Sequence, residues 1–150
     1  MFKAIRIFLL FFLLTGCSYD PILINKSFNF QFSEINTTGN KEINKIIKKN
    51  LKEKNNKGKK YSINLKTKKE KEVISSNAKG DPEVFKLKII LEYQVTYEGR
   101  NILVNNILEE FTYNNMGDKF ELLKIEENII KTIAKKIANE ISITVLSNNQ

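Results

Sequence analysis

Three stretches of the chain alternate hydrophobic and polar residues, and each predicts a β-strand. The stretch "SFNFQFSEI" places Phe28, Phe30 and Phe32 on one face and polar residues on the other. The stretch "KYSINLKT" alternates in the same way. The longest alternation, "VFKLKIILEYQVTYEG", keeps one face hydrophobic from Phe85 to Tyr97. A period of two with aromatic and branched residues is typical of strands that bury one face, so we expect all three to cover a core.

Two other stretches repeat their hydrophobic residues every three or four positions, which is typical of amphipathic helices. The first is "KEINKIIKKNLKEKNNKG", which ends at residues 56–58 and carries its lysines mainly away from the apolar stripe. The second begins at about Asp118, a side chain that can cap a helix, and runs to about Val145. The stripes consist of Ile43, Ile46, Ile47 and Leu51 in the first helix, and of Ile125, Ile129, Ile133, Ile137 and Ile141, flanked by Ala134 and Ala138, in the second. The small alanines should let the second helix approach a sheet closely.

The connecting segments are less regular. The stretch "NTTGN" should end the first strand, and "SSNAKGDPE" and residues 98–101 have turn chemistry. Residues 66–72, "KTKKEKE", are charged throughout and predict either a solvated continuation of the second strand or a loop. The return strand, "ILVNNILEEFTYNN", is apolar on both faces, which either a bulge or burial on two sides would explain.

The predicted order is β-α-β-β-β-α, an α+β two-layer sandwich with two helices on one face of a four-stranded mixed sheet. The first two strands should be parallel, because a helix connects them. The uncovered face should carry a mixed set of side chains: Lys86, Lys88, Ile90, Glu92, Gln94 and Thr96. That face must meet solvent, a lipid or a partner, and the long strands also present edges that soluble monomers usually protect.

The N-terminus has the pattern of a secretory signal peptide. Lys3 and Arg6 precede an apolar run from Ile7 to Leu14, which is shorter than half of the ~20 residues that a bilayer-spanning helix needs. The run ends in "LTGC", which resembles the bacterial lipobox and implies that Cys17 is acylated and begins the mature chain. A buried free cysteine is the alternative, but such a residue rarely follows an apolar N-terminal run and Thr-Gly.

The lipobox divides the chain into a signal peptide (1–16), a lipidated N-terminus and tether (17–25), a single α/β domain (26–146) and a short tail (147–150). Diacylglycerol and an N-acyl chain such as palmitate would hold the protein on the membrane. Ser18 follows the cysteine, where an Asp would be the inner-membrane retention signal in enteric bacteria. We therefore expect the periplasmic side of the outer membrane.

Charge and composition narrow the function further. The chain has 25 Lys and Arg against 17 Asp and Glu, a formal net charge of +8, although abundant Lys, Asn and Ile also suit an AT-rich genome. Export makes nucleic acid an improbable partner and anionic lipid a better one. With no histidine and a single cysteine, the chain cannot form a disulfide, a Cys/His zinc site or a His-based triad. The side chains of the neighbouring acids at 109–110 and 126–127 point in different directions on any strand or helix, so they do not form an acid/base dyad by themselves. From these absences together we expect neither an enzyme nor a bound metal or cofactor.

Together these features resemble one family, the outer-membrane lipopolysaccharide (LPS) assembly lipoproteins, LptE. The resemblance rests on the lipobox, the order of elements and two segments. The segment "FTYNNMGDKFELLKIEENIIKTIAKKIANEI" looks like the family's strand end leading into a long terminal helix, and "INKIIKKNL" resembles its first helix. Membership implies a plug and assembly factor inside the outer-membrane LPS translocon barrel, an LptD-like protein, and binding of LPS during its delivery to the cell surface.

The resemblance also implies where LPS would bind. In the family, basic residues in the turn before the long strand and near the start of the final helix are associated with LPS. The matching residues are Lys79 in "NAKGD" and Lys119 or Lys124 in "GDKFELLK". A simple solvated charge is the alternative for each lysine. The alternative for the whole protein is an accessory lipoprotein of another envelope lipid or solute transport system.

Overall fold

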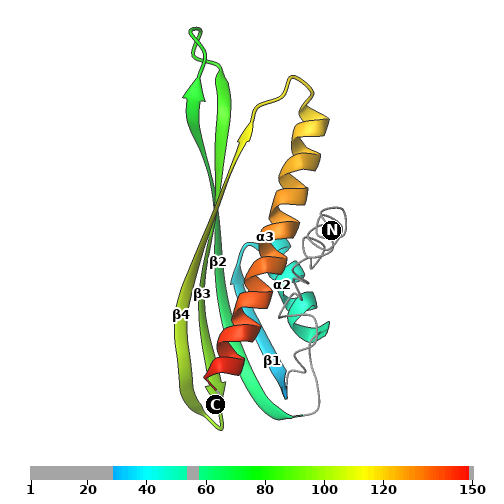
Figure 1. The fold of residues 1–150 in the computed structure, drawn as a ribbon, viewed down its shortest axis with the longest axis vertical. Coiled ribbons are helices and arrows are strands. Elements are labelled where there is room, and N and C mark those ends of the chain that lie inside the picture. The colour runs from blue at the N-terminus through cyan, green and yellow to red at the C-terminus, as the bar shows by residue number, and fades with distance from the viewer. Residues whose placement is uncertain (1–28, 54–57, 149–150) are drawn as a thin grey trace, which may run out of the picture.

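A computed structural model of the chain describes residues 29–53 and 58–148. Its elements follow the predicted order (Figure 1). They are β1 (Phe30–Gly39), α2 (Lys41–Glu53), β2 (Lys59–Ser76), β3 (Pro82–Tyr97), β4 (Arg100–Asn114) and α3 (Lys119–Ser147). The signal peptide, Cys17, the tether, Phe28 and the last two residues of the tail lie outside the described residues.

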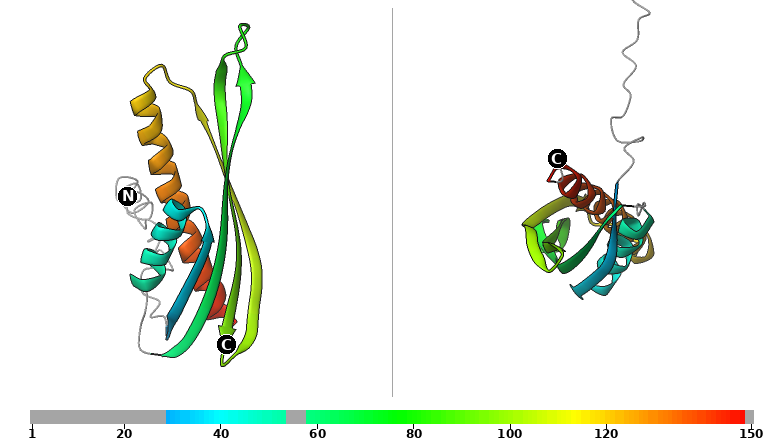
Figure 2. Two further views of the ribbon diagram at one scale, coloured as in Figure 1. Left: turned by 180° about the vertical axis from the view of Figure 1, so that it is seen from behind. Right: turned by 90° about the horizontal axis from the view of Figure 1, so that it is seen from below.

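The four strands form one mixed sheet in the order β1-β2-β3-β4. β1 pairs with β2 in parallel, as predicted, and β2–β3 and β3–β4 are antiparallel pairs. Both helices lie on the same face of the twisted sheet, and α3 runs along much of its length (Figures 1 and 2). The predicted α+β sandwich is therefore confirmed.

The core lies between this sheet face and the two helices. The predicted stripes supply its helix side, where Ile43, Ile47, Ile137 and both alanines of α3 are fully buried. The predicted alternation of β3 supplies its sheet side, with Leu87, Ile89, Leu91, Tyr93 and Val95 at 2% exposure or less. Asp118 caps α3 as expected, because its carboxylate accepts hydrogen bonds from the backbone N–H groups of Phe120 and Glu121. Burial of apolar surface in this layer is the main force that holds the fold together.

The first strand does not end at "NTTGN". β1 continues to Gly39, because pairing with β2 extends to Thr67 and overrides the local turn signal. Gly39 has φ +91°, and a Cβ there would lie 1.9 Å from the carbonyl oxygen of Thr67, so only glycine fits. Residues 66–72 likewise form a strand rather than a loop.

The irregular return strand has a different cause from burial on two sides. The β3–β4 register shifts between Val95 and Thr96, so Ile102 is left without an opposite residue in a bulge at the start of β4. Further along, Val104 and Leu108 are 72% and 59% exposed. Two-sided burial was therefore the wrong explanation. β4 is an edge strand whose outward-facing apolar residues are not covered by any described residue.

Candidate functional site

One end of the molecule extends beyond β1, and we call residues 68–90 and 108–126 the projecting end. The last residue pair of β1 joins Gly39 to Thr67, so β2 and β3 continue without it to the turn at 77–81. α3 begins at this same end, beside the long hairpin (Figure 1). The remaining described residues, which include all of β1 and α2, are called the body.

Lys79 lies in the hairpin turn of the projecting end. Asn77 organises this turn, because its Oδ1 accepts hydrogen bonds from the backbone N–H groups of Lys79 and Asp81, both at 2.9 Å. Gly80 supplies the positive φ of +87° that the turn requires. The side chain of Lys79 is therefore exposed at the tip of a well-braced turn.

Lys119 and Lys124 lie in the first two turns of α3, and both are exposed. Lys119 lines a hollow of about 500 Å³ between the start of β3 and the loop that precedes α3, together with Pro82, Glu83 and Asn115. The structure thus brings the three predicted lysines to one end of the molecule. It does not gather them into a single pocket.

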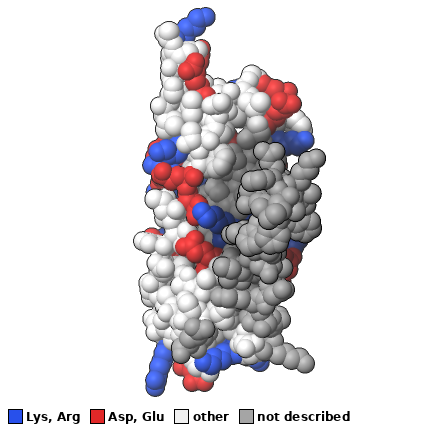
Figure 3. Space-filling view, viewed as in Figure 1, with Lys and Arg blue, Asp and Glu red and all other residues white. Residues whose placement is uncertain are grey.

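Acidic residues stand among these lysines. Asp81 and Glu83 follow the hairpin turn, and Asp118 and Glu121 surround the start of α3. Figure 3 shows a basic side chain at the tip of the hairpin with acidic ones directly below it. Within the described residues, none of the three lysines forms an ion pair. They can therefore act as separate point charges, but they do not make a continuous basic patch.

The projecting end also exposes large apolar side chains, which the sequence analysis did not identify. Phe120 and Leu123 on α3 are 75% and 59% exposed, and Val73 and Ile74 at the end of β2 are about half exposed. The signal for the helix pair was present in the sequence, because both residues stand outside the isoleucine stripe. Lysines and apolar side chains at one end give it an amphipathic surface.

A charged cluster holds α3 against the hairpin at the projecting end. Lys71 of β2 forms an ion pair with Glu126 of α3, and its Nζ lies 4.0 Å from the ring centre of Phe85. The hydroxyl of Tyr113 donates a hydrogen bond of 2.7 Å to the same carboxylate. This cluster adds polar contacts between α3 and the hairpin to the apolar packing of Phe85, Leu87 and Leu122 at the projecting end.

The cluster shifts the ionisation of its members. Burial tends to raise the pKa of Glu126, but hydrogen bonds from Lys71 and Tyr113 and the charges of Lys71 and Lys69 outweigh it, so the pKa lies below the ordinary value. Burial, together with the hydrogen bond to Glu126, raises the pKa of the Tyr113 hydroxyl. At neutral pH the cluster therefore holds an ionised carboxylate between two donors.

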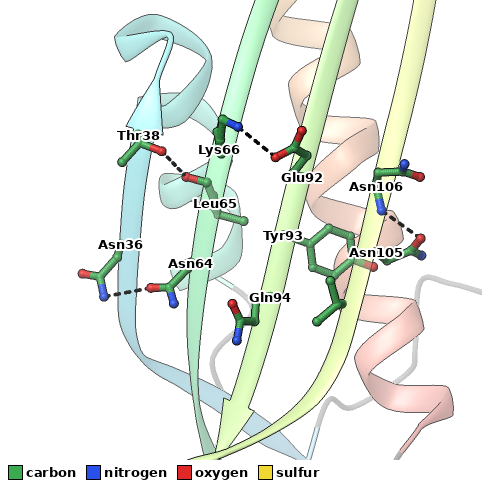
Figure 4. Close-up of a pocket in the computed structure, with 11 residues that line it drawn as sticks. Asn36, Thr38, Asn64, Leu65, Lys66, Glu92, Tyr93, Gln94, Asn105 and Asn106 are labelled. Atoms are coloured by element: carbon green, nitrogen blue, oxygen red, sulfur yellow. Dashed lines mark hydrogen bonds and ion pairs between the residues drawn. The ribbon is translucent and has the colours of Figure 1, made fainter.

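A second hollow, which we call the amide groove, lies in the body on the sheet face opposite the helices (Figure 4). Its volume is about 690 Å³, and side chains from all four strands line it. The sequence analysis had placed Glu92 and Gln94 on this face. It missed the asparagines of the other strands, because their positions follow from the register of four strands and not from any local motif.

Comparison with solved structures identifies proteins of the same fold. Rare lipoprotein B from Shewanella oneidensis matches with a TM-score of 0.61 and 13% identity, over 81% of this chain and 100% of that one. A minor lipoprotein from Acinetobacter baumannii matches with a TM-score of 0.57 and 10% identity, over 81% and 93%. Lipoprotein B from Nitrosomonas europaea matches with a TM-score of 0.54 and 15% identity, over 81% and 90%.

These similarities define the fold as one that several bacterial lipoproteins share, and at such low identity they show no more than the fold. No family model and no curated protein matches the sequence. Across residues 29–53 and 58–148, no helix is long and apolar enough to cross a membrane. Within the same residues, no group of three or more acidic or cysteine side chains is placed to hold a metal ion.

Proposed function

We propose that this protein is an outer-membrane lipoprotein that assembles with and plugs the LPS translocon barrel and binds LPS during its delivery to the cell surface. The observation that carries the proposal is the amphipathic projecting end, on a fold shared with bacterial lipoproteins. The lipobox supplies the anchor, with Cys17 as the acylated residue.

The projecting end suits a ligand that combines phosphates with acyl chains. Lys79, Lys119 and Lys124 offer exposed cations to phosphate groups, each as a point charge. Phe120 and Leu123 offer apolar surface beside two of these lysines, where an acyl chain can be partly shielded from water. LPS presents both kinds of group in one molecule, so this end of the protein would contact it.

The two free edges of the sheet favour β4 as the side that meets the barrel. Beyond β1, the free edge of β2 carries three lysines in residues 68–72, which is a common protection against strand pairing. β4 has no lysine in its 15 residues, and Ile102, Val104 and Leu108 are exposed on it. The charged residues of β4 are Arg100, Glu109 and Glu110, and the edge between them exposes apolar side chains, which is typical of a surface that a partner covers.

Purification from detergent-solubilised envelopes tests the assembly with the barrel. We expect an integral outer-membrane β-barrel protein to co-purify with the full-length lipoprotein. Co-purification with an inner-membrane ATPase complex instead would favour the accessory-transport alternative. If neither comes with the protein, the proposed assembly is wrong.

A pair of matched variants tests the role of β4. Val104→Lys with Leu108→Lys should abolish co-purification of the barrel, because two charges would be buried in the interface. Val73→Lys with Ile74→Lys is the control, since it replaces two exposed aliphatic residues with the same charges at the other free edge. Equal retention of the barrel by both variants would mean that β4 is not the contact.

A further inference from the structure

The amide groove has a form that neither the lipid anchor nor the projecting end explains. It is open on the sheet face opposite the helices, and its volume of about 690 Å³ is within the usual range of ~300–1,000 Å³ for small-molecule sites. Its walls stand on paired β-strands, which hold side chains more rigidly than loops do. The groove is therefore a preformed hollow.

Two rows of side chains cross the groove, and each row takes one residue from every strand. The first row consists of Asn36, Asn64, Gln94 and Val104, and the second of Thr38, Lys66, Glu92 and Asn106. Figure 4 shows the labelled members of both rows, such as Asn64, Gln94 and Glu92, near one another on the sheet. The groove thus presents a grid of mainly uncharged hydrogen-bonding groups.

The groove is electrically neutral in a chain whose net charge is +8. Among the described residues that line it, only Lys66 and Glu92 are charged, and they face each other across β2 and β3 in an ion pair of 3.1 Å. A phosphate-bearing ligand would find no unpaired cation there. An uncharged polar ligand meets no such obstacle.

Much of the hydrogen-bonding capacity of the groove is unused. Nδ2 of Asn36 donates to Oδ1 of Asn64 at 3.1 Å, which leaves the amide hydrogens of Asn64 available. The side-chain amides of Gln94 and Asn106 form no hydrogen bond with any described residue. Each amide group offers two donor hydrogens and an oxygen that accepts. Paired donors and acceptors of this kind match hydroxyl groups, which also donate and accept.

We propose that the amide groove binds a neutral saccharide chain through its hydroxyl groups. Asn64, Gln94 and Asn106 would hydrogen-bond the hydroxyls, and the exposed Val104 would contact the apolar C–H face of a sugar ring. The shared chemistry allows two sources, a free oligosaccharide or the sugar part of a glycolipid. The proposal does not depend on the lysines, since it concerns an uncharged ligand. The groove shares Val104 with the proposed barrel contact on β4, so its binding is tested on the lipoprotein without the barrel.

Titration of the full-length protein with saccharides tests the groove. The protein is kept in a detergent whose headgroup contains no sugar, so that the detergent does not compete. The first arm uses maltotriose and chitotriose as free neutral trisaccharides. The second uses the oligosaccharide released from LPS and dephosphorylated. Binding is measured by calorimetry and by the side-chain NH₂ signals of Asn64, Gln94 and Asn106 in ¹⁵N NMR spectra. We expect saturable binding in at least one arm, and the arm that binds more tightly identifies the source.

Variants locate the binding. Gln94→Ala with Asn106→Ala should raise the dissociation constant at least tenfold. Circular dichroism and melting should remain those of the wild type, because neither side chain is buried. Asn128→Ala is the control, since it removes an exposed amide on α3, outside the groove. Absence of saturable binding in both arms overturns the proposal. Binding that survives the double variant also overturns it, because the sugar then binds elsewhere.

Discussion

The body and the projecting end of this protein share one apolar core but differ in what covers the sheet and in the polar contacts that hold α3 against it. In the body, two helices cover four strands, and the buried side chains are almost all aliphatic or aromatic. At the projecting end α2 and β1 are absent, and the charged cluster of Lys71, Glu126 and Tyr113 supplements the apolar packing of buried side chains such as Leu87 and Leu122. The difference teaches that the body is built for stability, while the projecting end leaves apolar and basic side chains free to meet a ligand.

The largest effect should come from a cavity in the body. Ile137 is fully buried on α3, so Ile137→Ala should lower the free energy of unfolding by about 2–5 kcal/mol, measured by chemical denaturation. Phe120→Ala, at the exposed start of the same helix, should change it by no more than ~0.5 kcal/mol. Similar losses for both variants would mean that the two regions do not differ in packing as described.

A smaller and more local effect should come from the charged cluster. Glu126→Ala leaves Lys71 and Tyr113 without their shared acceptor, which should cost about 1–3 kcal/mol. Hydrogen exchange should therefore accelerate in the first turns of α3 and in residues 68–76, while the amides of the body keep their protection. Uniform acceleration throughout the chain would show that the projecting end is not an independent region.

The same carboxylate should make the projecting end sensitive to acid. The pKa of Glu126 is lowered on folding, so its contribution is present in full above the ordinary value of 4.5 and is lost as the pH falls through the folded value. In the wild type, the protection factors at the start of α3 should fall as the pH drops below the ordinary carboxyl value, even though the chemical exchange rate itself slows on acidification. Glu126→Gln should remove this pH dependence, and a variant that keeps it would assign the titration to another group.

Charge reversal at the projecting end should weaken LPS binding without unfolding the protein. Each lysine contact contributes about 1 kcal/mol, so Lys79→Glu with Lys119→Glu should raise Kd roughly ten- to thirtyfold, and less at high salt. Lys45→Glu with Lys52→Glu, on exposed positions of α2, changes the net charge equally. Equal loss of affinity in both variants would indicate bulk charge. Unchanged affinity in both would leave the protein as a structural plug.

Local sequence patterns predicted the parts of the fold in which the burial of a residue follows from its near neighbours in the sequence. The alternation of β3, the isoleucine stripe of α3 and the Asp118 cap all depend on neighbours a few positions away. The end of β1 at Gly39 was missed, because a strand 28 residues further along pairs with it and overrides its turn-like sequence.

The candidate sites were less predictable for the same physical reason. Lys71 and Glu126 are 55 positions apart, and no periodicity connects a charged β2 residue to a helix. The rows of the amide groove require the register of three strand pairs at once. The lysines were named through a resemblance, and the structure supplies their common location, while their ligand remains a proposal.

The smallest effect concerns a polar atom inside the body itself. The hydroxyl of Tyr93 is buried without a hydrogen-bond partner among the described residues, although its ring packs in the core. An unpaired buried hydroxyl costs free energy, so Tyr93→Phe should leave the free energy of unfolding unchanged or raise it by up to about 1 kcal/mol. Tyr61→Phe is a suitable comparison, since Tyr61 is as deeply buried but has interactions of its own. Denaturation curves of both variants decide the matter. A clear destabilisation by Tyr93→Phe would mean that the hydroxyl has a partner in the folded protein, and that the body is not held by apolar packing alone.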